Sequence, residues 1–115
     1  MSEISIVFVT AASEEEAARI GRTLVEERLA ACANIVPAIR SIYRWKGKIC
    51  DEREFLIIIK TRTSKYESLQ KRVKELHSYE VPEIVSIPVA RGLPQYLDWV
   101  WEETEGGSGG EGPGC

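Results

Sequence analysis

The sequence contains very little histidine and no paired cysteines. Its one histidine is His77, and its three cysteines lie far apart, at positions 32, 50 and 115, without a CxxC spacing. This pattern excludes the usual cysteine-based zinc sites and is typical of reduced thiols in a cytosol. Amide side chains are also scarce, with one Asn and two Gln beside 29% charged residues. That balance favours a heat-resistant source, because amides are thermolabile.

Long apolar runs and basic blocks are absent too. No run approaches the roughly 18 apolar residues of a membrane span, and Met1–Glu3 lacks the basic start of a signal peptide. Lys and Arg form no block longer than two within a net charge of −3, whereas a nucleic-acid groove needs a basic face. We therefore expect a cytoplasmic protein that binds neither membranes nor nucleic acid.

Recognisable catalytic motifs are missing as well. The chain has no Walker sequence and no GxGxxG, so no phosphate-binding loop is predicted. A Ser–His–Asp arrangement cannot be defended from a single histidine without geometry. We expect a protein without turnover chemistry.

The chain does contain several β-rich runs. Ile4–Thr10 is a β-branched run typical of a buried strand. Ala33–Trp45 and Ile49–Thr61 are longer, and the short segment Lys46–Lys48 between them predicts a hairpin. A last strand is expected over Glu83–Ala90, directly after a proline that blocks helix continuation.

Amphipathic segments separate these runs. Ser13 with Glu16, and Ser64 with Glu67, have the spacing of a capping box and predict the starts of two helices. A third helix is expected over Gln95–Glu103. Two β-α-β units joined by a hairpin make an α+β, ferredoxin-like βαββαβ domain with an added C-terminal helix. We assign residues 1–104 to this domain, and we expect the glycine-rich tail, 105–115, to be flexible.

The long runs are apolar on both sides. In Phe55–Ile59 successive residues are apolar, although the helices of an open ferredoxin-like sheet cover one face only. Strands of about 12 residues also exceed the usual length of 3–10. A large exposed apolar surface commonly marks a partner interface, so self-association is predicted.

The stretch LHSYEVPE, residues 76–83, holds the clearest candidate site. In the predicted sheet the end of the first strand, the end of the second helix and the start of the last strand share one end of the subunit. His77 and Glu83 are therefore expected near Thr10, and Cys32 and Lys60 at the opposite end. Three interpretations of His77 stay open: a metal ligand beside a carboxylate, a helix C-terminal residue suited to the dipole, or a general acid or base.

Five stretches together resemble the CutA divalent-cation tolerance family, in that family's order. They are ERLAACANI (27–35), SIYRWKGKI (41–49), IIIKT (57–61), LHSYEVPEI (76–84) and YLDWV (96–100). The resemblance implies a ferredoxin-like subunit in a tight homotrimer, a likeness to the trimeric PII signalling proteins, and a role in tolerance of copper or other divalent ions.

The resemblance also implies a metal site. The predicted ligands are His77 and Glu83, with Cys32 reaching them only from a neighbouring subunit. Two further ligands of some family members, a cysteine and a histidine, are replaced here by Val9 and Leu76. Binding of Cu²⁺ or another divalent metal is therefore expected to be weak, and no cofactor is required.

A second function stays open. A PII-like signalling trimer would bind a small anionic ligand between subunits, and we predict that Lys60, Arg28, Tyr79 and Trp45 would line such a pocket. A third is an enzyme that uses His77 as acid or base.

Overall fold

A four-stranded antiparallel sheet forms the centre of the computed structural model, which describes residues 3–106. Residues 107–115 of the predicted tail lie outside the described residues. The strands, in sheet order β2-β3-β1-β4, are β1 (Ile4–Ala11), β2 (Cys32–Trp45), β3 (Lys48–Arg62) and β4 (Ile84–Pro88). The helices are α1 (Glu14–Glu26), a 3-10 turn (Thr63–Lys65), α2 (Tyr66–Leu76) and α3 (Pro94–Glu103). The predicted βαββαβ order with an added helix is confirmed.

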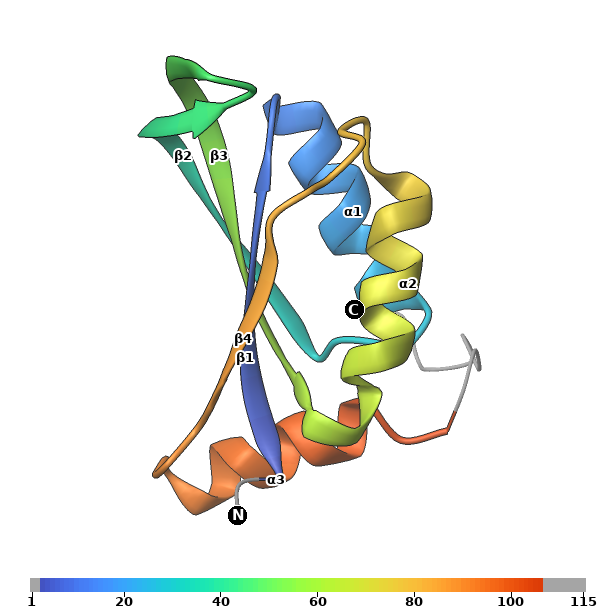
Figure 1. Cartoon of the computed structure of the whole chain (residues 1–115). Coiled ribbons are helices and arrows are strands. Elements are labelled where there is room, and N and C mark those ends of the chain that lie inside the picture. Colours follow the sequence, from blue (N-terminus) through green and yellow to red (C-terminus); the bar gives the residue numbers. More distant parts are fainter. Residues whose placement is uncertain (1–2, 107–115) are drawn as a thin grey trace.

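Helices α1 and α2 lie on the same side of the sheet, and α3 crosses its lower end (Figure 1). The alternation of strand residues determines which side chains face the helices. Val7 on β1 and Ile57 and Ile59 on β3 are fully buried, against Ile20 and Leu24 of α1. Leu69 and Val73 of α2 belong to the same core, so apolar contacts hold both helices on the sheet.

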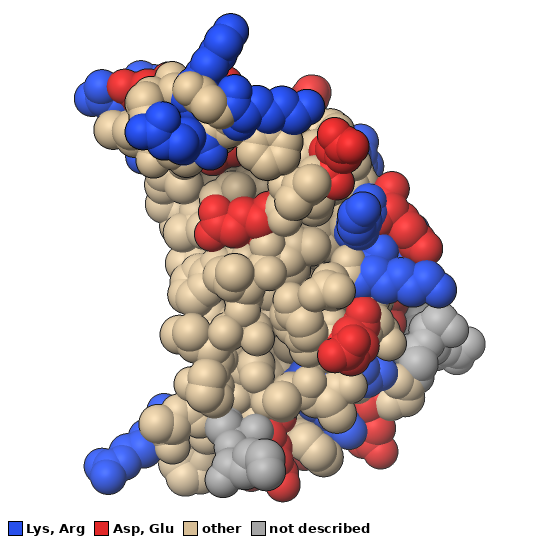
Figure 2. All heavy atoms as spheres, viewed as in Figure 1, with Lys and Arg blue, Asp and Glu red and all other residues tan. Residues whose placement is uncertain are grey.

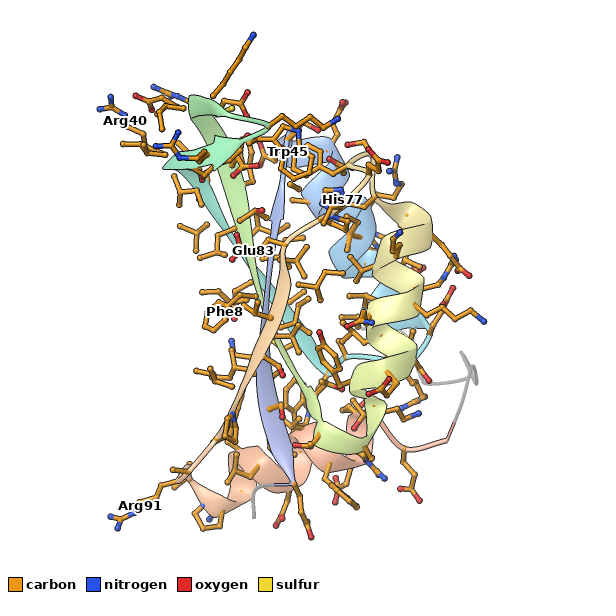
Figure 3. The ribbon with its side chains drawn as sticks, viewed as in Figure 1. Phe8, Arg40, Trp45, His77, Glu83 and Arg91 are labelled. Carbon is orange, nitrogen blue, oxygen red and sulfur yellow. The ribbon has the colours of Figure 1, made fainter. Side chains whose placement is uncertain are left out.

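The other face of the sheet is apolar and open. Phe8 points away from the helices (Figure 3), and its partner across the β1–β4 ladder is Val85, which is 50% exposed. Ile87, two residues further along β4, is 48% exposed. Figure 2 shows that this side of the molecule is largely uncharged, whereas the hairpin tip above it carries many basic side chains. On β3, Ile57 and Ile59 are buried under the helices, whereas Ile58, the register partner of Phe8, is partly exposed on the open face. The prediction that Phe55–Ile59 is apolar on both faces is therefore confirmed.

The second helix begins later than predicted. Ser64 lies in the 3-10 turn, and α2 begins at Tyr66 without a side-chain cap. The capping box predicted at Ser64 with Glu67 is therefore wrong. The physical reason is that the helical turn already begins at Thr63, after the extended residue Arg62, so Ser64 lies inside the turn and does not cap it. The backbone amide of Thr63 donates to the carbonyl oxygen of Glu3 at 2.8 Å. This contact holds the chain in a tight turn beside the start of β1.

Candidate functional site

His77 lies buried where α2 ends. Its backbone amide donates to the carbonyl oxygen of Val73 at 2.9 Å, its own backbone is extended, and its side chain is 0% exposed. The ring Nε2 lies 2.7 Å from the carbonyl oxygen of Thr10. The predicted meeting of the end of α2 with the end of β1 is therefore confirmed, and Figure 3 shows the ring between these elements.

The hydrogen bonds of His77 determine its tautomer. The backbone amide of Tyr79 donates to Nδ1 at 3.0 Å, so Nδ1 carries a lone pair and no proton. The ring proton therefore lies on Nε2, which donates to the carbonyl oxygen of Thr10. Both ring nitrogens are engaged within the chain, and in this geometry neither offers a lone pair to a metal ion.

Glu16 extends this network to a third segment. One oxygen, Oε2, accepts from the backbone amide of Ser78 at 2.7 Å and lies 3.6 Å from Nδ1 of His77. The other, Oε1, accepts from the backbone amide of Ala12 at 3.2 Å. Burial raises the pKa of Glu16, but the hydrogen bonds from Ser78 and Ala12 outweigh it, so this pKa lies below its ordinary value. Glu16 also donates its backbone amide to Ser13 Oγ, as the first capping box predicted.

A cavity of about 500 Å³ lies beside this network, between the β2–β3 hairpin and the loop that precedes β4. Its walls include the aromatic side chains of Tyr43, Trp45 and Tyr79. Its acidic side chains are Glu52, Glu54, Glu80 and Glu83. Figure 3 labels Trp45 on the hairpin and Glu83 in the loop just before β4, on two sides of this region.

Two of the cavity's carboxylates accept hydrogen bonds from its phenols. Tyr43 donates to Oε1 of Glu52 at 2.6 Å, and Tyr79 donates to Oε2 of Glu54 at 2.7 Å. The bond to Glu52 raises the pKa of Tyr43, and burial together with the bond to Glu54 raises the pKa of Tyr79. Both phenols therefore remain neutral donors. Within residues 3–106, no Lys or Arg nitrogen comes within 4.0 Å of a carboxylate oxygen of the four cavity glutamates.

The other end of the subunit holds the remaining predicted residues. Cys32 is the register partner of Lys60 across β2 and β3. The two residues therefore share the end of the subunit opposite His77, as the topology predicted. Both side chains donate to Oδ1 of Asn34. Arg28 lies 3.6 Å from Oε1 of Glu103 and also donates to that residue's carbonyl oxygen.

The predicted ligand sets do not assemble within one chain. For the metal set, His77 and Glu83 lie near Thr10 while Cys32 lies at the far end of β2. The predicted anion pocket divides in the same way: Trp45 and Tyr79 line the cavity, whereas the two basic residues lie at the opposite end.

No group of three or more His, Cys, Asp or Glu side chains suited to holding a metal ion exists among the described residues. Sequence reasoning missed Glu52 and Glu54. One signal could have found them: they alternate along β3, on the hairpin strand that pairs with the strand of Tyr43.

Comparisons with known proteins agree on one family. The family model described as CutA1 divalent ion tolerance protein matches residues 5–103. The divalent-cation tolerance protein CutA of Thermus thermophilus is 52% identical over 99 residues, which are 86% of this chain and 96% of that protein. Protein CutA of Mus musculus is 48% identical over 102 residues, which are 89% of this chain and 58% of the mouse protein.

Solved structures of CutA proteins also resemble this chain. The structure of the divalent cation tolerance protein of Thermus thermophilus has a TM-score of 0.85 at 51% identity, covering 87% of this chain and 97% of that one. The periplasmic divalent cation tolerance protein CutA of Archaeoglobus fulgidus has a TM-score of 0.86 at 46% identity, covering 89% of this chain and 99% of that one.

In residues 3–106 no helix is long and apolar enough to cross a membrane. By sequence and by fold, the chain belongs to the CutA1 divalent ion tolerance family.

Proposed function

We propose that this chain contributes to divalent-cation tolerance by binding a divalent metal ion weakly at the acid-lined cavity. The observation that supports this proposal most directly is a set of four cavity carboxylates, Glu52, Glu54, Glu80 and Glu83. Within residues 3–106, none of them forms an ion pair with a Lys or Arg side chain. Each of these side chains brings negative charge to one concave surface, and such a surface raises the local concentration of cations. The proposal includes no catalytic turnover.

Oxygen ligands that are not grouped around one point favour weak binding. An ion such as Mn²⁺ or Mg²⁺ is commonly held by one or two carboxylates and keeps several of its waters. Cu²⁺ instead gains most from imidazole nitrogen, and both nitrogens of His77 are engaged in hydrogen bonds. We therefore propose that Cu²⁺ binds through the same carboxylates, without the selectivity that an imidazole ligand would give.

We also propose that the chain works as a homotrimer. The proposal is supported by the open apolar face of the sheet, with Val85 and Ile87 about half exposed, and by strands β2 and β3 of 14 and 15 residues, which extend beyond the helices. Covering that face with neighbouring copies would remove apolar surface from water, at roughly 25 cal/mol per Å².

A paramagnetic titration tests the location of the metal site. Mn²⁺ added stepwise to ¹⁵N-labelled protein is expected to broaden the amide signals of residues 52–54 and 79–83 first, because these segments line the cavity. A matched titration of the Glu54→Gln/Glu83→Gln variant is expected to lose this broadening. Broadening that begins at Cys32 and Lys60, or that persists unchanged in the variant, would contradict the proposal.

No observation on the described residues favours the PII-like alternative, because the cavity that contains Tyr79 and Trp45 is acidic. The cytoplasmic location expected from the sequence stays a prediction, and the Archaeoglobus fulgidus relative is described as periplasmic.

A further inference from the structure

The cavity beside the hairpin has aromatic walls as well as acidic ones, and a metal ion would bind only to the acidic ones. Tyr43, Trp45 and Tyr79 contribute aromatic side chains, and carboxylates lie between them. Its volume of about 500 Å³ lies within the roughly 300–1,000 Å³ of small-molecule pockets. A bare ion with its water shell would leave the aromatic walls without a role.

Glu54 is the most deeply placed of these carboxylates. It is 5% exposed, and its side chain accepts from the hydroxyl of Tyr79 at 2.7 Å. A phenol stabilises a carboxylate without neutralising it, and a buried charge is costly unless a charge of opposite sign accompanies it. None of the described Lys, Arg or His side chains forms an ion pair with Glu54. A cation that enters the cavity would provide that missing charge.

The aromatic wall already attracts a cation from the chain itself. The Lys46 ammonium lies over the ring of Trp45, 5.7 Å from its centroid, within the range at which the electron-rich ring face attracts a positive charge. Trp45 is 44% exposed, so its ring is also accessible to a free cation. Tyr79 remains a neutral phenol, because burial and the bond to Glu54 raise its pKa.

We propose that this cavity binds a small organic ammonium ion, with the charged nitrogen near Glu54 and its alkyl groups against the aromatic walls. Carboxylates supply the opposite charge and aromatic rings supply the cation–π contacts, which is the combination that recognises alkylated ammonium groups. The site goes beyond the metal binding proposed above and does not depend on it, since no metal takes part in these contacts.

The test uses choline as the probe and its neutral carbon isostere as the matched ligand control. Each is titrated into metal-free, ¹⁵N-labelled full-length protein at constant ionic strength. Choline is expected to shift the amide signals of residues 43–45, 52–54 and 79–83 in a saturable way, and the isostere is expected to leave them unchanged. Equal binding of the two compounds, or binding of neither, would overturn the proposal.

Two variants assign the binding to the named groups. Glu54→Gln keeps the shape and removes the charge, so it is expected to weaken choline binding at least ~10-fold, the loss typical of a charged contact. Glu102→Gln, an exposed change on α3, is expected to leave it unchanged. Trp45→Leu provides a second variant in case Glu54→Gln fails to fold, and is expected to weaken binding by about 5-fold. Unchanged binding in the folded Glu54→Gln variant, or in Trp45→Leu where that variant replaces it, would overturn the proposal.

The Mn²⁺ titration of the same protein separates this inference from the proposed function. If the protein shows Mn²⁺ broadening but does not bind choline, the proposed ammonium site is overturned and the proposed metal site is not. Saturable choline binding without Mn²⁺ broadening supports the ammonium site and contradicts the metal proposal.

Discussion

His77 and Thr10 are joined by a 2.7 Å hydrogen bond between the imidazole Nε2 and the backbone carbonyl oxygen. This bond connects the end of α2 to the end of β1. The same ring accepts a hydrogen bond from the backbone amide of Tyr79, whose side chain forms part of the cavity wall. His77 itself does not line the cavity, but its hydrogen bond to the Tyr79 amide positions the Tyr79 side chain in the cavity wall.

His77→Ala is expected to lower the free energy of unfolding by about 3 kcal/mol, because the change leaves a buried donor and acceptor unpaired and opens a cavity. His77→Gln is expected to lose only about half as much, since its amide nitrogen can still donate to Thr10. Urea unfolding of the two variants and the wild type measures the difference. Equal losses in both variants would show that the bond to Thr10 contributes little.

Glu16 makes the free energy of unfolding depend on pH. Its folded-state pKa lies below the ordinary value of 4.5, so its contribution is fully present above that value and is lost as the pH falls through the lower folded pKa. Glu16→Gln has no carboxylate to titrate. The stability advantage of the wild type over Glu16→Gln, measured by urea unfolding, is therefore expected to shrink from about pH 5 to about pH 3. A constant advantage across this interval would contradict the assignment.

The substitution Val85→Glu, followed by sedimentation, tests the proposed trimer. The wild type is expected to sediment with about three times the 12.9 kDa mass of one chain, and Val85→Glu is expected to shift this mass toward that of a monomer, because the change places a charge on the open apolar face. Val25→Glu is the matched control, since Val25 is 40% exposed on α1, on the helical side of the sheet. A monomeric wild type, or a trimer that persists in Val85→Glu, would argue against this interface.

Much of the fold was predictable from local patterns. The hairpin at Lys46–Lys48 and the cap at Ser13 depend on short-range chemistry, and both are confirmed. The 3-10 turn at Thr63–Lys65 was not predictable, because the amide of Thr63 is held by Glu3, which is distant in sequence. The irregularity of β2 between Val36 and Ile39 had a signal that was missed, since proline at position 37 cannot donate to the ladder.

The site was predictable only in part. The antiparallel topology was enough to predict that His77 lies close to Thr10 and far from Cys32. The tautomer of His77 was not predictable, because it depends on the backbone amide of Tyr79, which turns back onto the ring. The cavity was missed because Glu54 resembles an ordinary surface charge in sequence, and its burial arises from the fold around it.

The central claim is that the cavity carboxylates, and not His77, carry the cation binding. Calorimetric titration of Cu²⁺ into the wild type, Glu52→Gln/Glu54→Gln and His77→Gln tests this claim most directly, because Cu²⁺ is the ion that would gain most from an imidazole ligand. We predict at least ~10-fold weaker binding in the double variant, as expected for lost charged contacts, and affinity within about 2-fold of the wild type in His77→Gln. Weaker binding in His77→Gln with unchanged binding in the double variant would contradict the account.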